Sequence, residues 1–348
     1  MMNLYQTQHP FYCGIDLHAN EMYACVVDQS GKKLLHRNFK TRQPEKLFEK
    51  LEPYGTDVIV GCESTFNWYW LCDACEEKKI PFILGHALYL KAIHGGKVKS
   101  DKIDSEKLAR LLRGGNFAVS YAYPSDWRST RDLLRRRGHL VNRRGETLAH
   151  IQIVNHQQNL PAFPKRLQYK ANRQDIAKRF DDPAVAFSIQ TDVDLLESYD
   201  VVIRKLEKFL EQSAKVHDAN IFYLLKTIPG VGKIIAMTLL YEIHDIKRFP
   251  EVGDFLSYAR LVRGSHTSAG KNYGSPGRKM GNRYLKWAFS EIVPLLKRES
   301  PAAKKYLERI EKKQGKARAH SNLATKLGRA VYFMLRRGEA FDIAKLIR

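Results

Sequence analysis

The sequence lacks a long apolar segment and an even set of cysteines, and each absence narrows the class of protein. No apolar run approaches the roughly 20 residues of a membrane span, and the start, MMNLYQTQHPFY, lacks the charged, apolar and small-residue succession of a signal peptide. The five cysteines all lie at or before position 75 and are odd in number. This pattern is typical of buried thiols in a reducing compartment. We therefore expect a cytoplasmic protein without disulfides.

Acidic residues are scarce relative to basic ones. The chain has 59 Lys and Arg against 37 Asp and Glu, a formal net charge of +22. Such a balance favours phosphate-bearing partners, although it does not by itself distinguish nucleic acid from a membrane surface. With 348 residues, 44% of them hydrophobic, the chain has enough apolar material for two cores and a connector. We predict domains over residues 1–124, 125–215 and 216–348.

The first domain shows the alternation of strands and helices that is typical of an RNase H-like α/β fold. Three β-prone stretches are separated by short polar turns, and two helices then alternate with two buried strands. The expected strands are 11–19, 21–31, 32–40, 57–65 and 81–87, and the expected helices are 44–55 and 66–80. The stretch 101–115 predicts a further, acidic helix.

Four carboxylates fall at positions that suit a metal site. Asp16 lies in the first expected strand and Glu63 ends the fourth, while Asp101 and Asp104 share one face at the start of the acidic helix. Gathered together they would repel one another unless cations lay among them, and two Mg²⁺ ions roughly 4 Å apart stabilise the attacking and leaving oxygens of a phosphodiester. The alternative is an N-capping Asp101, a surface Asp104 and two unconnected acids.

Two weaker metal signals lie nearby. Cys72 and Cys75 form one C-x-x-C pair inside an expected helix, which is more often two packed thiols than a zinc site. His18 shares its strand face with Asp16 and is placed to assist that site.

Beyond residue 124 the sequence is almost wholly helical. Residues 126–150 hold seven arginines against three acids, with Arg135 and Arg136 among the expected nucleic-acid contacts. Residues 192–216 form a second long pattern, so the two predict an antiparallel helical hairpin, a coiled-coil connector or a dimerisation arm. A solvated bundle is an equal alternative.

Residues 228–233, IPGVGK, lie between two apolar helices and predict a helix-hairpin-helix. Gly230 and Gly232 let backbone N–H groups approach a phosphate, and Lys233 adds charge. The alternative is an ordinary tight turn.

The stretch 263–287 combines basic residues, several glycines and hydroxyls with no acid. Its expected phosphate contacts are Arg263, Lys271, Arg278 and Lys279. A serine in this setting either donates to the phosphate backbone, which residue types alone favour, or attacks phosphorus as a nucleophile.

Together, GIDLH, CEST, DKIDSEKLARLL, IPGVGKIIA, TSAGK and GRKMGNRYLK resemble the transposases of the insertion-sequence 110 family over nearly the whole chain. The resemblance implies a RuvC-like domain with Asp16, Glu63, Asp101 and Asp104 as metal ligands, a coiled-coil connector, and a mainly α transposase domain with Ser268 as nucleophile. Ala269 follows that serine where the family often has glycine. Ser105 stands where the family commonly has alanine, and we expect it on an exposed turn.

The resemblance also implies an activity and partners. These are site-specific DNA recombination with Mg²⁺, or alternatively Mn²⁺, a structured noncoding guide RNA, and a homotetramer built from dimers whose active sites combine two subunits. The arginine-rich helix and residues 312–337 are the expected RNA contacts. Two alternatives remain: a RuvC-like endonuclease that uses metal and water alone, as a junction resolvase would, and a non-catalytic nucleic-acid scaffold.

Overall fold

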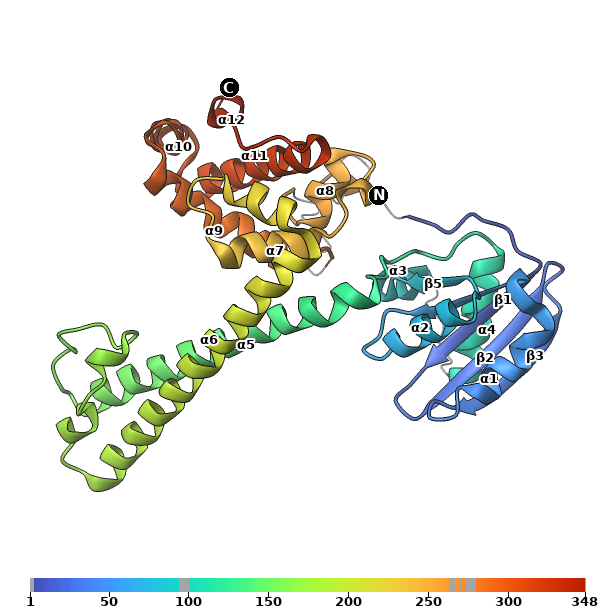
Figure 1. The fold of residues 1–348 in the computed structure, drawn as a ribbon, viewed down its shortest axis with the longest axis horizontal. Coiled ribbons are helices and arrows are strands. Elements are labelled where there is room, and N and C mark those ends of the chain that lie inside the picture. Colours follow the sequence, from blue (N-terminus) through green and yellow to red (C-terminus); the bar gives the residue numbers. More distant parts are fainter. Residues whose placement is uncertain (1–2, 94–99, 263–266, 269–270, 273–279, 348) are drawn as a thin grey trace. The chain divides into compact units, whose positions relative to one another are not determined.

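The computed structural model describes residues 3–93, 100–262, 267–268, 271–272 and 280–347. The chain forms two compact units, residues 1–125 and 126–348. The first is a sheet with helices on both faces, and the second is mostly helical (Figure 1). The prediction of an α/β region followed by a helical one is confirmed. Among the described residues, no helix has the length and apolar character to span a membrane.

The first unit is built on a five-stranded sheet in the order β3-β2-β1-β4-β5. Its strands are β1 (Phe11–Leu17), β2 (Glu21–Asp28), β3 (Lys33–Lys40), β4 (Val58–Glu63) and β5 (Phe82–Gly85). The first three form an antiparallel meander, and β4 and β5 run parallel to β1. Parallel neighbours need crossover connections. The crossovers contain α1 (Glu45–Leu51) with η1 (Glu52–Asp57), and α2 (Tyr69–Glu77).

Strand alternation gives the sheet two separate cores. Cys13 and Ile15 of β1 pack with α1 and α2 on one face, while Tyr12 faces α4 (Asp101–Arg113) on the other. Gly14 shares the α4 face, where a Cβ would lie 2.2 Å from the backbone nitrogen of Ala109. The backbone of α4 therefore rests directly on β1, which fixes where the helix begins. Figure 1 shows α1 and α2 on one side of the sheet and α4 on the other. The remaining helix of this unit is α3 (Ala87–Ile93).

The second unit begins with a long helical hairpin made of α5 (Ser125–Gln157) and α6 (Pro183–Lys226). Three ion pairs, each with a 2.6 Å separation, join the helices: Arg137 to Glu207, Arg144 to Asp200, and His150 to Asp192. Partner numbers fall along α6 as they rise along α5, so the helices are antiparallel. The connection between them contains η2 (Lys170–Asn172) and η3 (Ile176–Arg179).

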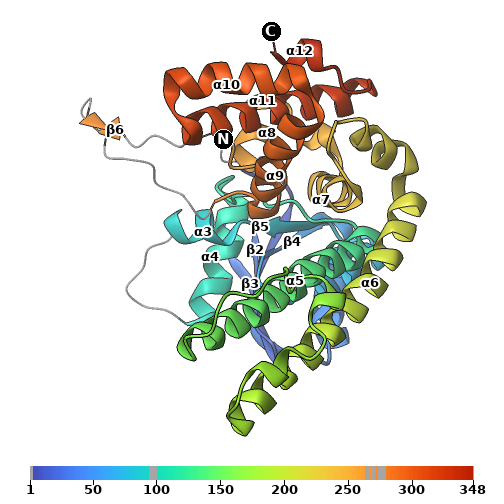
Figure 2. The same ribbon diagram turned by 90° about the vertical axis from the view of Figure 1, so that its left-hand side faces the viewer.

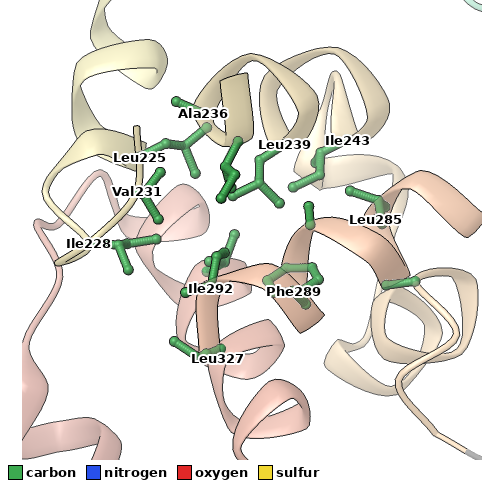
Figure 3. Close-up of a cluster of buried hydrophobic side chains, with 14 of the residues drawn as sticks. Leu225, Ile228, Val231, Ala236, Leu239, Ile243, Leu285, Phe289, Ile292 and Leu327 are labelled. Carbon is green, nitrogen blue, oxygen red and sulfur yellow. The ribbon is translucent and has the colours of Figure 1, made fainter. Parts of the chain in front are cut away.

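The rest of this unit packs around one apolar core. Its elements are α7 (Lys233–Ile243), η4 (Ile246–Arg248), α8 (Val252–Tyr258), β6 (Thr267–Ser268), β7 (Lys271–Asn272), α9 (Arg283–Glu299), α10 (Pro301–Gln314), α11 (Lys316–Arg337) and α12 (Ile343–Ile347). Figure 3 shows Leu239, Phe289 and Leu327 in this core, from three different helices.

A proline inside α9 is accommodated by a neighbouring helix. Pro294 has no N–H to donate to the carbonyl of Ser290. The Nε2 atom of His320, on α11, lies 3.1 Å from that carbonyl oxygen and satisfies it. This hydrogen bond joins α9 and α11 at the point where Pro294 interrupts the main-chain hydrogen bonds of α9.

Candidate active site

Asp16 and Glu63 lie on the same face and at the same edge of the sheet. The last pair of the parallel ladder between β1 and β4 is Ile15 with Cys62, so each acid is the next residue along its strand. Gly61 faces α4, because a Cβ there would lie 2.8 Å from Leu112. By alternation Glu63 shares that face, as Asp16 shares it with Gly14. Both carboxylates therefore project on the side of the sheet that α4 covers.

The first turn of α4 is held against this edge. Ser100 caps the helix, with its hydroxyl accepting from the backbone N–H of Ile103 at 3.3 Å. Nε2 of His36, on β3, lies 2.8 Å from the carbonyl oxygen of Lys102. Asp101 thus lies in the first turn and is not the N-cap. The turn that carries Asp101 and Asp104 is anchored to a strand two positions away in the sheet.

Ser105 is fully buried, so the expectation of an exposed turn was wrong. Its hydroxyl donates to the carbonyl of Lys102 at 2.9 Å and lies 3.5 Å from Nε2 of His36. Its backbone carbonyl is one of the atoms that a Cβ at Gly14 would meet, at 2.4 Å. Position 105 faces the sheet and tolerates only a small side chain.

Three side chains gather closely at the edge of the sheet: Asp16, His18 and Asp101. Nε2 of His18 lies 3.3 Å from Oδ2 of Asp16 and 3.5 Å from Oδ1 of Asp101. All three ligand atoms lie within 4.8 Å of one another. His18 was expected only to assist the site, although it shares its strand face with Asp16, and that parity was the signal in the sequence for a closer role. The close group does not include Glu63 or Asp104.

The electrostatics of Asp16 fit a cation site. Burial raises the pKa of its carboxyl above the ordinary value, and the negative charges of Asp101 and Asp104 raise it further, while His18 opposes the shift. Asp104 also accepts from Nζ of Lys107 at 2.9 Å. A divalent cation would relieve the repulsion that raises this pKa. The donor set therefore fits such an ion.

The C-x-x-C pair shows no sign of a metal site. Cys75 is buried and Cys72 half-buried on α2, and neither forms a disulfide. Burial raises the pKa of Cys75 to about 12, which disfavours the thiolate that zinc requires. In the part of the chain that the structure describes, the group around Asp16 is the one place where three such ligands converge.

The turn between α6 and α7 places the predicted hairpin residues in different settings. Gly230 has φ of +83°, and a Cβ there would lie 2.7 Å from Leu295, so packing against α9 also requires glycine. Gly232 is the N-cap of α7 and has open space around it. Nζ of Lys233 lies 3.5 Å from Glu211. The start of α7 has no side-chain cap, whereas the ammonium of Lys233 already has an acidic partner.

The arginine-rich face of α5 is largely engaged within its own unit. Arg135 forms a bidentate pair with Glu242, at 2.7 and 2.9 Å, and its guanidinium lies 4.5 Å from the ring centroid of Tyr284. Burial alone would raise the pKa of Glu242, but Arg135 and Arg131 outweigh burial and lower it. Arg136, by contrast, is exposed. The cationic surface of α5 is therefore smaller than the residue count indicates.

Of the serine-bearing segment, the structure describes two short strands. Ser268 in β6 pairs with Lys271 in β7. The other predicted phosphate contacts here, Arg263, Arg278 and Lys279, lie outside the described residues. After the segment, Nδ2 of Asn282 donates to the buried Glu242 at 2.7 Å, and its side-chain oxygen caps α9. The start of α9 is thus tied to the same carboxylate that binds Arg135.

Two family models match this chain. A model described as "Transposase IS116/IS110/IS902 family" matches residues 223–308. A second, described as "Transposase" and named for the DEDD transposases of IS110, matches residues 13–155. The second range contains all four predicted carboxylates.

Relatives agree with the two models. The transposase for insertion sequence element IS1328 of Yersinia enterocolitica is 23% identical, over 94% of this chain and 98% of that protein. The transposase for IS1533 of Leptospira borgpetersenii is 21% identical, over 68% of this chain and 70% of that protein. The match to the y4qE protein of Sinorhizobium fredii, 28% identical, covers 62% of this chain but only about half, 53%, of the relative. The chain belongs to the IS110 family of transposases.

Proposed function

We propose that this protein is a divalent-metal-dependent DNA recombinase in which the carboxylates at the sheet edge act on the scissile phosphodiester. The observation that carries the proposal is the convergence of Asp16, His18 and Asp101 within 4.8 Å, on the segment that matches a DEDD transposase model. The strand order β3-β2-β1-β4-β5 with α4 on the site face supports assignment of the first unit to the RuvC-like class.

Asp16 and Asp101, with His18, would hold the metal, and Glu63 and Asp104 complete the acidic set on the same face. Carboxylate oxygens suit Mg²⁺ and Mn²⁺ equally, and an imidazole ligand shifts preference toward the transition metal. When bound, such an ion supplies positive charge beside the phosphate and lowers the pKa of a hydroxyl that contacts it. β1 would present the carboxylate of Asp16 to the ion, and the first turn of α4 would present that of Asp101.

We assign the nucleophile to Ser268. Its Oγ forms a bond to phosphorus as the bond from phosphorus to the leaving nucleoside oxygen breaks, and the serine proton leaves with the departing oxygen or through solvent. The product is a phosphoserine linkage and a free hydroxyl on the DNA end. The neighbouring Lys271, exposed on β7, supports the assignment because a cation stabilises charge on the phosphate.

A second copy of the chain is the proposed partner of α6. Four exposed apolar residues follow one another at intervals of seven on this helix, before its kink at Asp218: Leu195, Val202, Phe209 and Val216. A seven-residue apolar repeat on a face turned away from α5 is the seam of a coiled coil. A dimer formed this way is the building block of the proposed tetramer, and a structured guide RNA is its proposed nucleic-acid partner.

The catalytic proposal is tested with purified protein, labelled DNA that carries the element ends, and the RNA transcribed beside the element. We expect cleavage that requires Mg²⁺ or Mn²⁺ and is lost in Asp16→Asn, with Asp57→Asn as the matched control. Cleavage that leaves free phosphate ends and no protein adduct would show that the nucleophile is water and not Ser268. If the protein binds DNA without cleaving it, and neither metal nor Asp16→Asn changes the binding, the protein is a non-catalytic scaffold.

The oligomer proposal has its own test. Light scattering on the full chain should give a dimer, and Phe209→Glu should give a monomer. Gln212→Glu, an equally exposed change on the same helix, should leave the dimer intact. A wild-type protein that stays monomeric at high concentration would show that the seam has another occupant.

A further inference from the structure

Two of the three side chains that gather at the sheet edge lie where the backbone is least constrained. Asp16 is within β1, but His18 follows the last residue of that strand. Asp101 is the first residue of α4, and the ends of helices fray. The side chains of His18 and Asp101 are 54% and 60% exposed, so core packing does not hold them. Because the charges of Asp16 and Asp101 repel, their close approach requires contacts that hold them together.

An imidazole from an edge strand of the sheet holds the first turn of α4. Nε2 of His36, on β3, lies 2.8 Å from the carbonyl oxygen of Lys102. Because a carbonyl only accepts, Nε2 carries the proton and donates it. Lys102 directly follows Asp101, so this hydrogen bond lies in the turn that carries the carboxylate. The atoms of α4 nearest to a Cβ at Gly14 belong to residues 105–109, beyond this turn.

The ring of Tyr23 fixes the orientation of this imidazole. Tyr23, on β2, is the cross-strand partner of Asp16. The ring centroids of Tyr23 and His36 lie 5.2 Å apart with an interplanar angle of 78°, the edge-to-face arrangement that aromatic pairs favour. Figure 2 shows α4 beside β2 and β3. A series of contacts therefore links Asp16, through Tyr23 and His36, to the turn that carries Asp101.

A second anchor holds the turn that carries His18. Nδ2 of Asn67, in the segment that follows β4, donates to the backbone carbonyl of His18 at 2.7 Å. Oγ1 of Thr65 donates to Oδ1 of Asn67 at 3.0 Å, which directs the amide nitrogen toward that carbonyl. Oγ1 of Thr41, which follows β3, donates to the carbonyl of Ala19 at 2.9 Å. The turn is thus held from the segments after β4 and after β3.

We propose that His36 and Asn67 are positioning residues of the metal site, where His36 acts through Asp101 and Asn67 acts through His18. Neither side chain belongs to the group of ligands, and each donates one hydrogen bond to the backbone that carries a ligand. Ligands that are already held in place lower the ordering cost of binding. The inference rests on the proposed metal site and adds the residues that control its affinity.

The test is the Mn²⁺ affinity of the full chain, measured by calorimetry and, for weak sites, from the rise of the melting temperature with Mn²⁺ concentration. His36→Ala and Asn67→Ala should each weaken binding by about ten-fold, as the loss of outer-shell partners does. His36→Gln should restore most of the affinity, because its amide nitrogen is as many bonds from Cα as Nε2 and also donates. The matched controls Leu34→Ala and Asn116→Ala change exposed residues of the same unit and should leave the affinity unchanged.

Paired substitutions identify the ligand through which each residue acts. In an Asp101→Ala background, His36→Ala should change the Mn²⁺ affinity by less than about two-fold, whereas Asn67→Ala should keep its full effect. In a His18→Ala background the pattern should be reversed. A general loss of stability would not produce this crossed pattern, because it does not depend on which ligand is present.

Two results would overturn the proposal. Unchanged Mn²⁺ affinity in both alanine variants would show that the two hydrogen bonds only stabilise the fold, an effect that the melting temperature of the metal-free protein would record. Equal losses in every background, without rescue by His36→Gln, would show that the variants disturb the whole unit and not one ligand. A wild type that binds no Mn²⁺ would overturn the carboxylate proposal as well, whereas variants that bind as the wild type does would overturn the positioning roles alone.

Discussion

Replacing Asp16 by asparagine should stabilise the metal-free protein while abolishing its response to metal. The folded state raises the pKa of this carboxyl through burial and through the charges of Asp101 and Asp104. A raised folded pKa means that the ionised group costs stability, and the cost disappears as pH falls through that pKa. Asparagine removes the charge but keeps an oxygen for His18. The variant should therefore gain stability at neutral pH and lose that advantage in acid.

Burial is the largest cause of the raised pKa and His18 opposes it; the part of the cost that comes from repulsion between the acids follows from the distance between them. Ligand atoms of Asp16 and Asp101 within 4.8 Å repel by about 1 kcal/mol at the dielectric of water and by about 3.5 kcal/mol at an effective dielectric of 20. Asp101 is 60% exposed, so the lower value applies. For a unit of this size, about 1 kcal/mol raises the melting temperature by about 4 °C.

The assay is thermal unfolding of the full chain with and without Mn²⁺, at neutral pH and near pH 5. At a concentration of 100 times the dissociation constant, Mn²⁺ should stabilise the wild type by about 2.7 kcal/mol, and less in acid because protons compete for Asp16. Asp57→Asn, an exposed change in the same unit, should behave as wild type. An Asp16→Asn protein that is less stable without metal, yet keeps the Mn²⁺ shift, would refute the reasoning.

Three further outcomes are expected. His18→Ala should weaken Mn²⁺ binding more than Mg²⁺ binding, as measured by calorimetry. An equal loss of affinity for both ions would show that His18 positions Asp16 and does not bind the metal. Gly14→Ala should lower the free energy of unfolding in urea by about 3 kcal/mol, because its Cβ meets the backbone of α4. Gly138→Ala, with open space around it, should be neutral or stabilising. Equal effects of the two changes would contradict the contact between Gly14 and α4. Glu242→Gln should cost about 3–5 kcal/mol because it removes a buried carboxylate from the half-buried guanidiniums of Arg131 and Arg135. Glu146→Gln, in an exposed pair, should cost under about 0.5 kcal/mol. Similar melting temperatures would show that the Glu242 pair adds little.

Local periodicity in the sequence was enough to place the carboxylates of the sheet. The strands of Asp16 and Glu63 are buried almost throughout, so burial alone shows no period, but strand alternation puts the two acids on the faces of Gly14 and Gly61. The parallel register then puts both at one edge. The likeness of this sheet to RuvC-like domains stays a proposal, and so do the three domain boundaries.

Ser105 was misjudged because the centre of the buried stripe of α4 was misplaced. Ser105, Leu108 and Leu112 form the stripe that lies on the sheet, at spacings of three and four. Asp104 lies at its border, which explains why its carboxylate reaches Lys107. A stripe of apolar residues alone does not reveal that a small polar residue belongs to it.

Charge counting overestimated the cationic face of α5 because pairing is non-local. Arg135 meets Glu242, which is 107 residues away in the sequence, and Arg137 meets Glu207 on the facing helix. Such partners become visible only once the helices are packed.

The most direct test of the central claim is mass spectrometry of the protein–DNA adduct. Protein, RNA and DNA carrying the element ends are incubated with Mg²⁺, the adduct is isolated on a denaturing gel, and its peptides are sequenced after nuclease and trypsin digestion. The account predicts a phosphonucleotide on Ser268, absent in Ser268→Ala and in reactions without divalent metal. Attachment to Thr267, Ser265 or Ser275, or cleaved DNA with no adduct in either protein, would contradict it.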